Sequence, residues 1–410
     1  DLTLYGTSKY FERTASNYRI IGRDGFGATA RFVTRAELFG RPNEFTMGTD
    51  LFYQSGPVET YQNIGGKKGD RLDKLIDETI GNTGFYIQNT FNLIRGKLDL
   101  LLSGRYDKVL FDSRNLLAEV QNDARRFEDF TPKAALNFKL TPTIAAFTSY
   151  GLSFDSPAAN ELDNPKTTSS STASLLNPDL KPQQSKNFEL GVKGNVVTPE
   201  EGLPHSLFFE ATFFNTIIDD EIVPFELAPG DVFFRNSART RRTGLELGAN
   251  IEIVKGLKLK ASYTFSDFKY KEYITRTIVD SMGNEVVRDL DFSNNVVPSV
   301  PKHNLGLALS HEQELAEKVT GFIKLSYTNI SGMYTDDGNS ERTTGYQLVN
   351  ATVGLDVVLD RFDLLISAGA NNIANKTYVA FININSTNKQ FYEAGEPRNY
   401  FVGINLGYAL

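Results

Sequence analysis

The stretch Thr243–Phe265, TGLELGANIEIVKGLKLKASYTF, shows most clearly the pattern that recurs along this chain. Every second residue from Leu245 to Ile253 is apolar, and the residues between them are charged, polar or glycine. After a Lys255-Gly256 turn, apolar residues alternate again from Leu257 to Phe265, now with lysine, serine and threonine between them. Because a period of two is the period of a β-strand, the stretch predicts a hairpin with one apolar face.

The length of each arm fits a strand that crosses a membrane, because a tilted transmembrane strand needs roughly 9–11 residues. After Phe265 the alternation inverts: Asp267 takes an apolar position, and Phe268 and Tyr270 take polar ones. We interpret this inversion as the end of the lipid-facing band. The residues that we expect to face lipid are Leu247, Ile251, Leu259 and Ala261.

Composition narrows the class of protein. No window of the 410 residues approaches the roughly 18 uninterrupted apolar residues of a helical membrane span. The net charge is −7 with acids and bases mixed, so no basic tract predicts a nucleic-acid partner. Cysteine is absent, which fits an oxidising periplasm. The sequence begins at Asp1 without methionine or an apolar leader, so we expect a removed signal or a fragment of a longer protein.

The alternating pattern recurs in sixteen arms along the whole chain. Short turns are expected near 40–43, 95, 141, 198–204, 255, 313–317 and 360. Long polar loops are expected at about 12–26, 55–84, 110–126, 154–185, 218–241, 267–301, 330–345 and 375–397. Strict alternation of short and long connections is typical of an outer-membrane barrel with periplasmic turns and extracellular loops. We therefore predict an all-β protein, a transmembrane antiparallel up-and-down β-barrel, with both termini toward the periplasm.

Closure of the barrel leaves two alternatives open. Unpaired strand edges in lipid cost several kcal/mol per backbone group, so the sheet must close. Sixteen strands can close alone around an aqueous channel, as in a porin. Alternatively, further strands precede Asp1.

Several segments resemble signature sequences of the TonB-dependent outer-membrane receptors. They are YGLSFDSP (150–157), NPDLKPQQSKNFELGVK (177–193), FFRNSARTRRTGLELG (233–248), VPKHNL (300–305), NNIANKTYV (371–379) and GEPRNYFVGINLGY (395–408). They occur in the family's order over about the last 260 residues. Residues 1–149 fit the family in alternation more than in motif.

The resemblance implies a barrel of about 22 strands with a plug in its lumen, driven by an inner-membrane complex that pulls on an N-terminal peptide. The sequence contains neither a plug segment nor an energy-coupling box, and Leu410 stands where an aromatic residue usually ends such barrels. We therefore interpret residues 1–410 as the C-terminal barrel portion of such a receptor, with the plug and about six strands outside this sequence.

No catalytic or metal site is predicted. The only histidines are His205, His303 and His311, which form neither a hydrolase triad nor a zinc-ligand cluster. Among receptors of the resembled family, haem uptake implies a histidine between the SFDSP and NPDL motifs, and none lies there. Two acidic stretches lack the spacing of a calcium loop, and we interpret them as solvated carboxylates. They are Asp289, Asp291 and Asn294, and Asp336, Asp337, Asn339 and Glu341.

An arginine-rich segment is the strongest candidate for ligand contact. Arg235, Arg239, Arg241 and Arg242 lie where a long loop descends into a strand. Four guanidinium groups at a pore mouth focus positive potential on anionic solutes, and they fit the carboxylates or catecholates of many siderophores. Two other interpretations compete with ligand contact: contact with lipopolysaccharide phosphates, and pairing with lumen acids such as Glu246.

Loop aromatics offer a second ligand-binding device. A stacking cage for an organic ligand would draw on Phe225, Phe233, Phe234, Tyr270, Tyr273, Tyr334, Phe381, Phe391 and Tyr392. Each of them alternatively belongs to the aromatic girdle at the membrane interface. The candidates that we select for ligand contact are the four arginines with Phe233, Phe234, Tyr334, Phe391 and Tyr392.

These observations predict an outer-membrane active transporter of a Gram-negative bacterium, without enzymatic activity or cofactor. We expect its ligand to be a ferric siderophore or a similar metal chelate, and its partners to be a TonB-type coupling complex, outer-membrane lipid and lipopolysaccharide. The alternatives are a self-closed 16-stranded passive porin and a surface binding or adhesion barrel.

Overall fold

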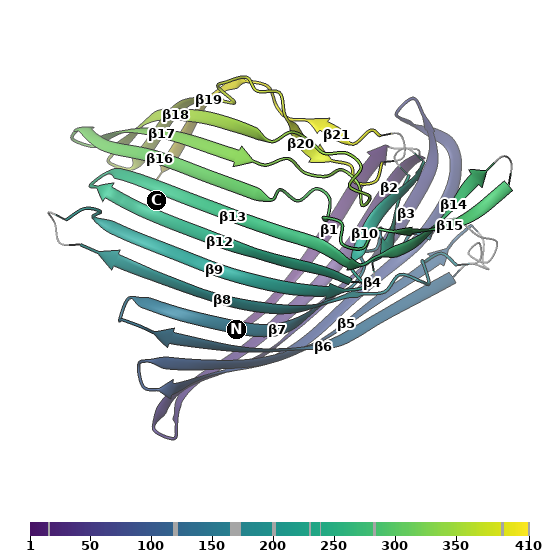
Figure 1. The fold of residues 1–410 in the computed structure, drawn as a ribbon, viewed down its shortest axis with the longest axis horizontal. Helices are drawn as coiled ribbons and strands as arrows, with labels where there is room; N and C mark the ends of the chain where they lie inside the picture. The colour runs from purple at the N-terminus through teal and green to yellow at the C-terminus, as the bar shows by residue number, and fades with distance from the viewer. Residues whose placement is uncertain are drawn as a thin grey trace.

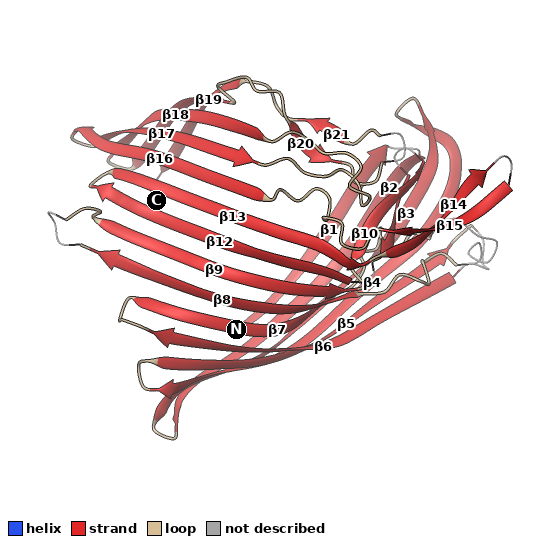
Figure 2. Cartoon of the chain, in the orientation of Figure 1, coloured by secondary structure: helices blue, strands red, loops and turns tan. Residues whose placement is uncertain are grey.

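A computed structural model describes residues 1–14, 17–117, 122–164, 174–198, 202–228, 231–237, 239–281, 284–386 and 389–408. These residues form 22 strands and no helix (Figure 2). Among them, accordingly, no helix is long and apolar enough to cross a membrane.

Sixteen strands form one antiparallel sheet in the order in which they follow along the chain. They are β1 (Leu2–Thr14), β2 (Asn17–Leu38), β3 (Arg41–Ile64), β4 (Lys67–Ile94), β5 (Leu98–Asn115), β6 (Asn122–Lys139), β7 (Ile144–Asp155), β8 (Gln183–Val197), β9 (Ser206–Asp219), β12 (Arg239–Val254), β13 (Leu257–Glu272), β16 (His303–Ala316), β17 (Val319–Ile330), β18 (Tyr346–Leu359), β19 (Phe362–Asn371) and β22 (Asn399–Tyr408). The sixteen predicted arms are confirmed.

Three small hairpins stand outside the main sheet and belong to its long connections. They are β10 (Ile222–Ala228) with β11 (Asp231–Asn236), β14 (Ile274–Ser281) with β15 (Asn284–Asp291), and β20 (Val379–Ile382) with β21 (Tyr392–Ala394). All three lie at one end of the main strands (Figure 1).

The main sheet curves into a wall that wraps around a central space (Figure 1). Its hydrogen-bonded order runs from β1 to β22, and these two strands are not paired with each other in the part of the chain that the structure describes. The described residues therefore do not form the self-closed 16-stranded cylinder that the porin alternative requires.

Short turns connect the strands at one end of the sheet, on the left of Figure 1, as the sequence predicted. The last described strand also ends there, because Tyr408 of β22 pairs with Phe362, the first residue after a short turn. The chain begins part-way along the sheet, because Leu2 of β1 pairs with Ala30, eight residues before the end of β2 at Leu38.

Several stretches predicted as loops are strands. Most of the polar stretches 12–26, 55–84 and 110–126 extend β1 to β6, and β3 turns into β4 at Gly65 and Gly66, whose φ angles are 59° and 86°. Glycine adopts such left-handed angles without a steric penalty. The prediction failed because outside a lipid band both faces of a strand can be polar, so alternation disappears while backbone pairing continues.

Apolar faces of neighbouring strands coincide across the sheet. Leu259 of β13 pairs with Ile251 of β12 on one side and with Leu309 of β16 on the other. Leu309 in turn pairs with Leu325 of β17, and both side chains are exposed. Because strand pairing keeps partners on one face, this row forms a continuous apolar outer surface.

The inverted phase after Phe265 is also present in the structure. β13 continues to Glu272, and Tyr270 lies on the opposite face from Leu259, where only 1% of it is exposed. It packs with Val223, Tyr273 and Val297 from the connections that cover the concave side of the wall. The core of the protein therefore lies at the loop end, between strand extensions and loops.

Candidate functional site

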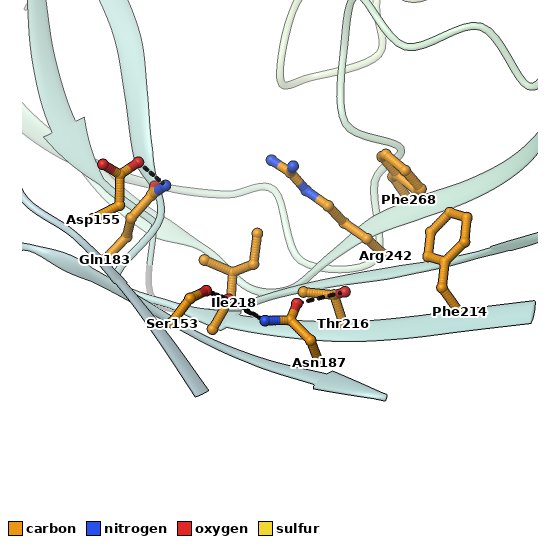
Figure 3. Close-up of a pocket in the computed structure, with 10 residues that line it drawn as sticks. Ser153, Asp155, Gln183, Asn187, Phe214, Thr216, Ile218, Arg242 and Phe268 are labelled. Atoms are coloured by element: carbon orange, nitrogen blue, oxygen red, sulfur yellow. Dashed lines mark hydrogen bonds between the residues drawn. The ribbon is translucent and has the colours of Figure 1, made fainter. Parts of the chain in front are cut away.

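A cavity of about 360 Å³ opens on the concave face of the wall, near the loop end. Pockets for small molecules range from about 300 to 1,000 Å³, so this one has room for a small ligand. Five consecutive strands of the sheet contribute to it (Figure 3). Its lining residues are Ser153, Asp155, Gln183, Ser185, Asn187, Phe214, Thr216, Ile218, Arg242 and Phe268.

One side of the cavity is a network of uncharged polar side chains. The Asn187 amide nitrogen donates to the hydroxyls of Ser185 at 2.9 Å and Ser153 at 3.3 Å. The Thr216 hydroxyl donates to the Asn187 amide oxygen at 2.9 Å. These bonds hold Asn187 in one orientation (Figure 3). Hydroxyl and amide groups both donate and accept hydrogen bonds, so this side suits a ligand with amide-like groups.

The opposite side combines aromatic rings with a neutralised cation. Phe214 and Phe268 lie edge to face, with centroids 6.1 Å apart. The Arg242 guanidinium lies 5.5 Å from the Phe268 centroid and forms an ion pair with the buried carboxylate of Glu221. The second charged group of the lining is Asp155, whose carboxylate accepts a hydrogen bond of 2.9 Å from the Gln183 amide.

The structure separates the four candidate arginines. Arg242 lines the cavity, but Arg239 and Arg241 stand an odd number of positions away on the same strand and so belong to the outer face. Arg239 bonds Asp219 at 2.7 Å and Glu272 at 3.3 Å. The sequence analysis expected all four arginines at one pore mouth, but strand alternation divides them between two faces. Three of them have carboxylate partners, namely Arg235, Arg239 and Arg242. Whether any of them contacts a ligand stays a prediction.

Arg235 belongs to a polar hub where loops meet on the concave side. Its guanidinium lies 3.8 Å from Asp337 and donates to the Tyr273 hydroxyl at 2.8 Å. Asp337 accepts from the hydroxyls of Tyr270 at 2.7 Å and Tyr273 at 3.0 Å, and from the Asn385 amide at 2.9 Å. The hub thereby joins β13, β11, the β17–β18 connection and the β19–β22 connection.

Burial dominates the electrostatics of this hub. Asp337 is only 1% exposed, and burial raises the pKa of its carboxyl above the usual range, against the lowering effect of its hydrogen bonds. Burial likewise raises the pKa of Tyr273. The interpretation of Asp337 as a solvated loop carboxylate was wrong, because neighbouring loops fold over it. Among the described residues, no group of three histidines and carboxylates is arranged to hold a metal ion.

The candidate aromatics are spread through the loop region. Phe233 packs against Phe225 at 6.3 Å, while Phe234 packs on a separate apolar cluster that includes Phe111 and Leu180. Tyr334 lies beneath the Arg342 guanidinium. None of these rings lines the cavity, so the structure does not assemble them into one cage around it.

Two further candidates stand side by side near the end of the chain. Phe391 is buried, whereas the neighbouring Tyr392 is exposed and donates a 2.5 Å hydrogen bond to Glu341. That bond to a carboxylate raises the pKa of Tyr392 to about 12. Their contact with a ligand also stays a prediction.

Sequence reasoning missed the polar side of the cavity. Ser153 and Asp155 lie in the SFDSP segment, and Gln183, Ser185 and Asn187 lie in KPQQSKN. These residues alternate with Phe154, Lys186 and Phe188, so their common face was visible as a strand pattern. What the sequence did not reveal is that these segments pair with each other and with β9 to form one surface.

A family model described as "TonB dependent receptor-like, beta-barrel" matches residues 1–373, which is most of the chain. The chain belongs to the TonB-dependent receptor family. Members of this family are outer-membrane receptors of Gram-negative bacteria and not enzymes, and we place this TonB-dependent receptor chain in that membrane.

Curated relatives of this TonB-dependent receptor include the ferrioxamine B receptor of Salmonella typhimurium, 24% identical over 332 residues. The match covers 80% of this chain and 41% of the relative. The ferrioxamine receptor of Yersinia enterocolitica is also 24% identical, over 79% of this chain and 41% of its own length. The chain thus spans less than half the length of these relatives.

Solved structures support the same fold. The unliganded ferric citrate transporter FecA matches with a TM-score of 0.72 and 18% identity, over 99% of this chain and 58% of that one. BauA, the ferric preacinetobactin receptor of Acinetobacter baumannii, matches with a TM-score of 0.69 and 18% identity, over 96% of this chain and 55% of that one. At these identities the likeness concerns the barrel fold alone.

Proposed function

We propose that this chain is the barrel portion of an outer-membrane active transporter that takes up a ferric siderophore through its extracellular loops and lumen. The observation that carries the proposal is the cavity on the concave face, which offers hydrogen-bonding and aromatic groups beneath the loops of a TonB-dependent receptor barrel. The two ferrioxamine receptors among its relatives favour a ferric siderophore as ligand.

Three partners complete the proposal. A TonB-type complex supplies energy through an N-terminal plug region that lies outside residues 1–410. The complete barrel closes with about 22 strands. The short turns and both chain ends face the periplasm. The apolar row around Leu259 contacts outer-membrane lipid, and the charged outer row that includes Lys186 and Arg239 lies at the level of lipopolysaccharide.

The test is growth in iron-depleted medium with a single ferric siderophore as iron source. A strain that lacks this receptor should fail to grow on its siderophore, and a strain with the receptor but without TonB should fail as well. A passive porin would support uptake without TonB. An adhesion barrel would bind a surface partner, and its deletion would leave iron-dependent growth unchanged.

The mass of the mature protein tests the domain proposal separately. A mass well above the 45.7 kDa of this chain is expected if a plug and further strands belong to it. A mass near 45.7 kDa, together with TonB-independent uptake, would favour the self-closed porin.

A further inference from the structure

The charges around the cavity restrict which ferric chelate it accepts. Arg242 is the only cationic side chain among the described lining residues, and Glu221 neutralises it through an ion pair in which the carboxylate is only 6% exposed. Because Arg242 is neutralised, the carboxylate of Asp155 gives the cavity lining a net formal charge of one negative unit. A site of this kind does not attract an anion, whatever the number of arginines nearby in the sequence.

Other arginines of the concave side are paired in the same way. Five arginines of the concave side have carboxylate partners, whereas Arg125 donates to the carbonyl oxygens of Asn177 and Leu180. The pairs are Arg19 with Glu78 and Asp163, Arg23 with Glu78, Arg105 with Asp50 and Asp107, Arg235 with Asp337, and Arg242 with Glu221. A guanidinium group that is already paired with a carboxylate must break that ion pair before it can bind an anionic ligand. The carboxylate is then left unpaired, and its negative charge opposes binding of the anion.

The net charge of a ferric chelate depends on the groups that bind the iron, so the charge of the cavity favours some classes of chelate over others. A hydroxamate binds iron(III) as a monoanion, so three hydroxamates give a neutral complex. Catecholates bind as dianions and leave the complex strongly negative, and citrate complexes are also anionic. The uncharged hydroxyls and amides of Ser153, Asn187 and Thr216, with the rings of Phe214 and Phe268, match a neutral chelate with amide groups and methylene linkers.

We propose that this cavity selects ferric chelates of zero or positive net charge, of the hydroxamate type, and discriminates against catecholate and carboxylate chelates. Glu221 is the residue that sets this preference, because it cancels the charge of Arg242. The inference rests on the proposed function and replaces the expectation that the arginines recruit anionic siderophores.

The test is equilibrium binding of radioactive iron chelates to the complete purified receptor in detergent. The probes are ferrioxamine B, a ferric tris-catecholate and ferric citrate. We expect the wild-type receptor to bind ferrioxamine B at least about tenfold more tightly than either anionic chelate, a discrimination that corresponds to about 1.4 kcal/mol. The Glu221→Gln variant frees the Arg242 charge and should reduce this ratio about tenfold.

Two further variants keep the test decisive. Asp155→Asn removes the other negative charge without touching the ion pair, so it should shift the ratio in the same direction even if Glu221→Gln fails to fold. Lys186→Gln is the matched control, because Lys186 pairs with Asp219 on the outer face and its loss should leave the ratio unchanged. Folding of each variant is checked by its resistance to unfolding in detergent at room temperature.

The outcomes separate the inference from the proposed function. Binding of none of the three chelates by the wild-type receptor would remove the proposed function itself. Equal or tighter binding of an anionic chelate, or a ratio that neither Glu221→Gln nor Asp155→Asn changes, would overturn the charge preference and leave siderophore uptake standing.

Discussion

Ala261 provides the sharpest test of which face of the wall meets lipid. It is the middle one of five alternating apolar positions on β13 from Leu257 to Phe265, and it pairs with Ala249 and Leu307 in the outer apolar surface. Eight steps of roughly 3.3 Å cover about 26 Å of strand, or about 20 Å of height at a tilt near 40°. Ala261 therefore lies about 10 Å from either edge of the band, close to the bilayer midplane.

An arginine on the lipid face near the midplane costs roughly 2–4 kcal/mol of folding free energy, and near the interface only about 0–1 kcal/mol. Ala261→Arg should thus destabilise the receptor by about 2–4 kcal/mol. Leu259→Arg, about 5 Å nearer to the short turn, should cost less, about 1–3 kcal/mol. Lys260→Leu alters the concave face between them and should stay within about 0.5 kcal/mol of the wild type.

The assay is urea unfolding of the receptor refolded into lipid vesicles. With a slope of about 1–3 kcal/mol per molar urea, a loss of about 2–4 kcal/mol lowers the Ala261→Arg midpoint by about 0.7–4 M. Equal losses for Ala261→Arg and Lys260→Leu would refute the assignment of faces. A larger loss for Leu259→Arg than for Ala261→Arg would instead refute the depth argument.

Four further predictions concern the cavity and the hub. Asn187→Ala removes three hydrogen bonds and should weaken ferrioxamine B binding about tenfold in the iron-binding assay. Gly244→Ala should weaken binding and cost about 1–3 kcal/mol in urea unfolding, because its Cβ would lie 2.3 Å from the Phe214 ring and 2.4 Å from the Phe265 carbonyl oxygen. Asp337→Asn should accelerate hydrogen exchange in the loops around residues 331–345 and 372–398, measured by mass spectrometry, while strand amides near Leu259 stay protected. Burial raises the pKa of Asp337 in the folded hub above its unfolded value, so protonation of Asp337 favours the folded hub. The free energy of opening of the hub should therefore fall as pH rises from the unfolded to the folded pKa, and it should level off above the folded pKa. The same pH profile of exchange in Asp337→Asn, after correction for intrinsic rates, would contradict this assignment.

Strand reasoning succeeded wherever one face of a strand is apolar. The outer residues Leu247, Leu259 and Leu309 alternate with polar residues over whole arms, so the sequence indicated both the strands and their apolar face. The short turns were equally visible, because they interrupt two alternating runs. The strand extensions beyond the lipid-facing band could not be predicted from the sequence, because their residues show no simple alternation. Arg19 and Glu78, for example, both point to an interior that loops cover.

The candidate site was only partly predictable. Arg242 was among the selected residues and lines the cavity, but its partner Glu221 was not selected, because 21 residues separate them along the chain. The burial of Asp337 was missed for the same reason. Its partners Tyr270 and Asn385 come from segments 67 and 48 residues away, and loop packing brings them together.

The sixteen strands of the main sheet, their antiparallel order and their apolar surface follow from the sequence alone, because they depend on a period of two and on turns between neighbouring arms. The sequence also contains the family motifs. Which charged side chains remain free to bind a ligand is visible only in the folded protein, because ion pairing depends on how strands and long connections meet across the concave face. Arg242 looks like a free cation in the sequence, but its ion pair with Glu221 neutralises its charge in the folded protein.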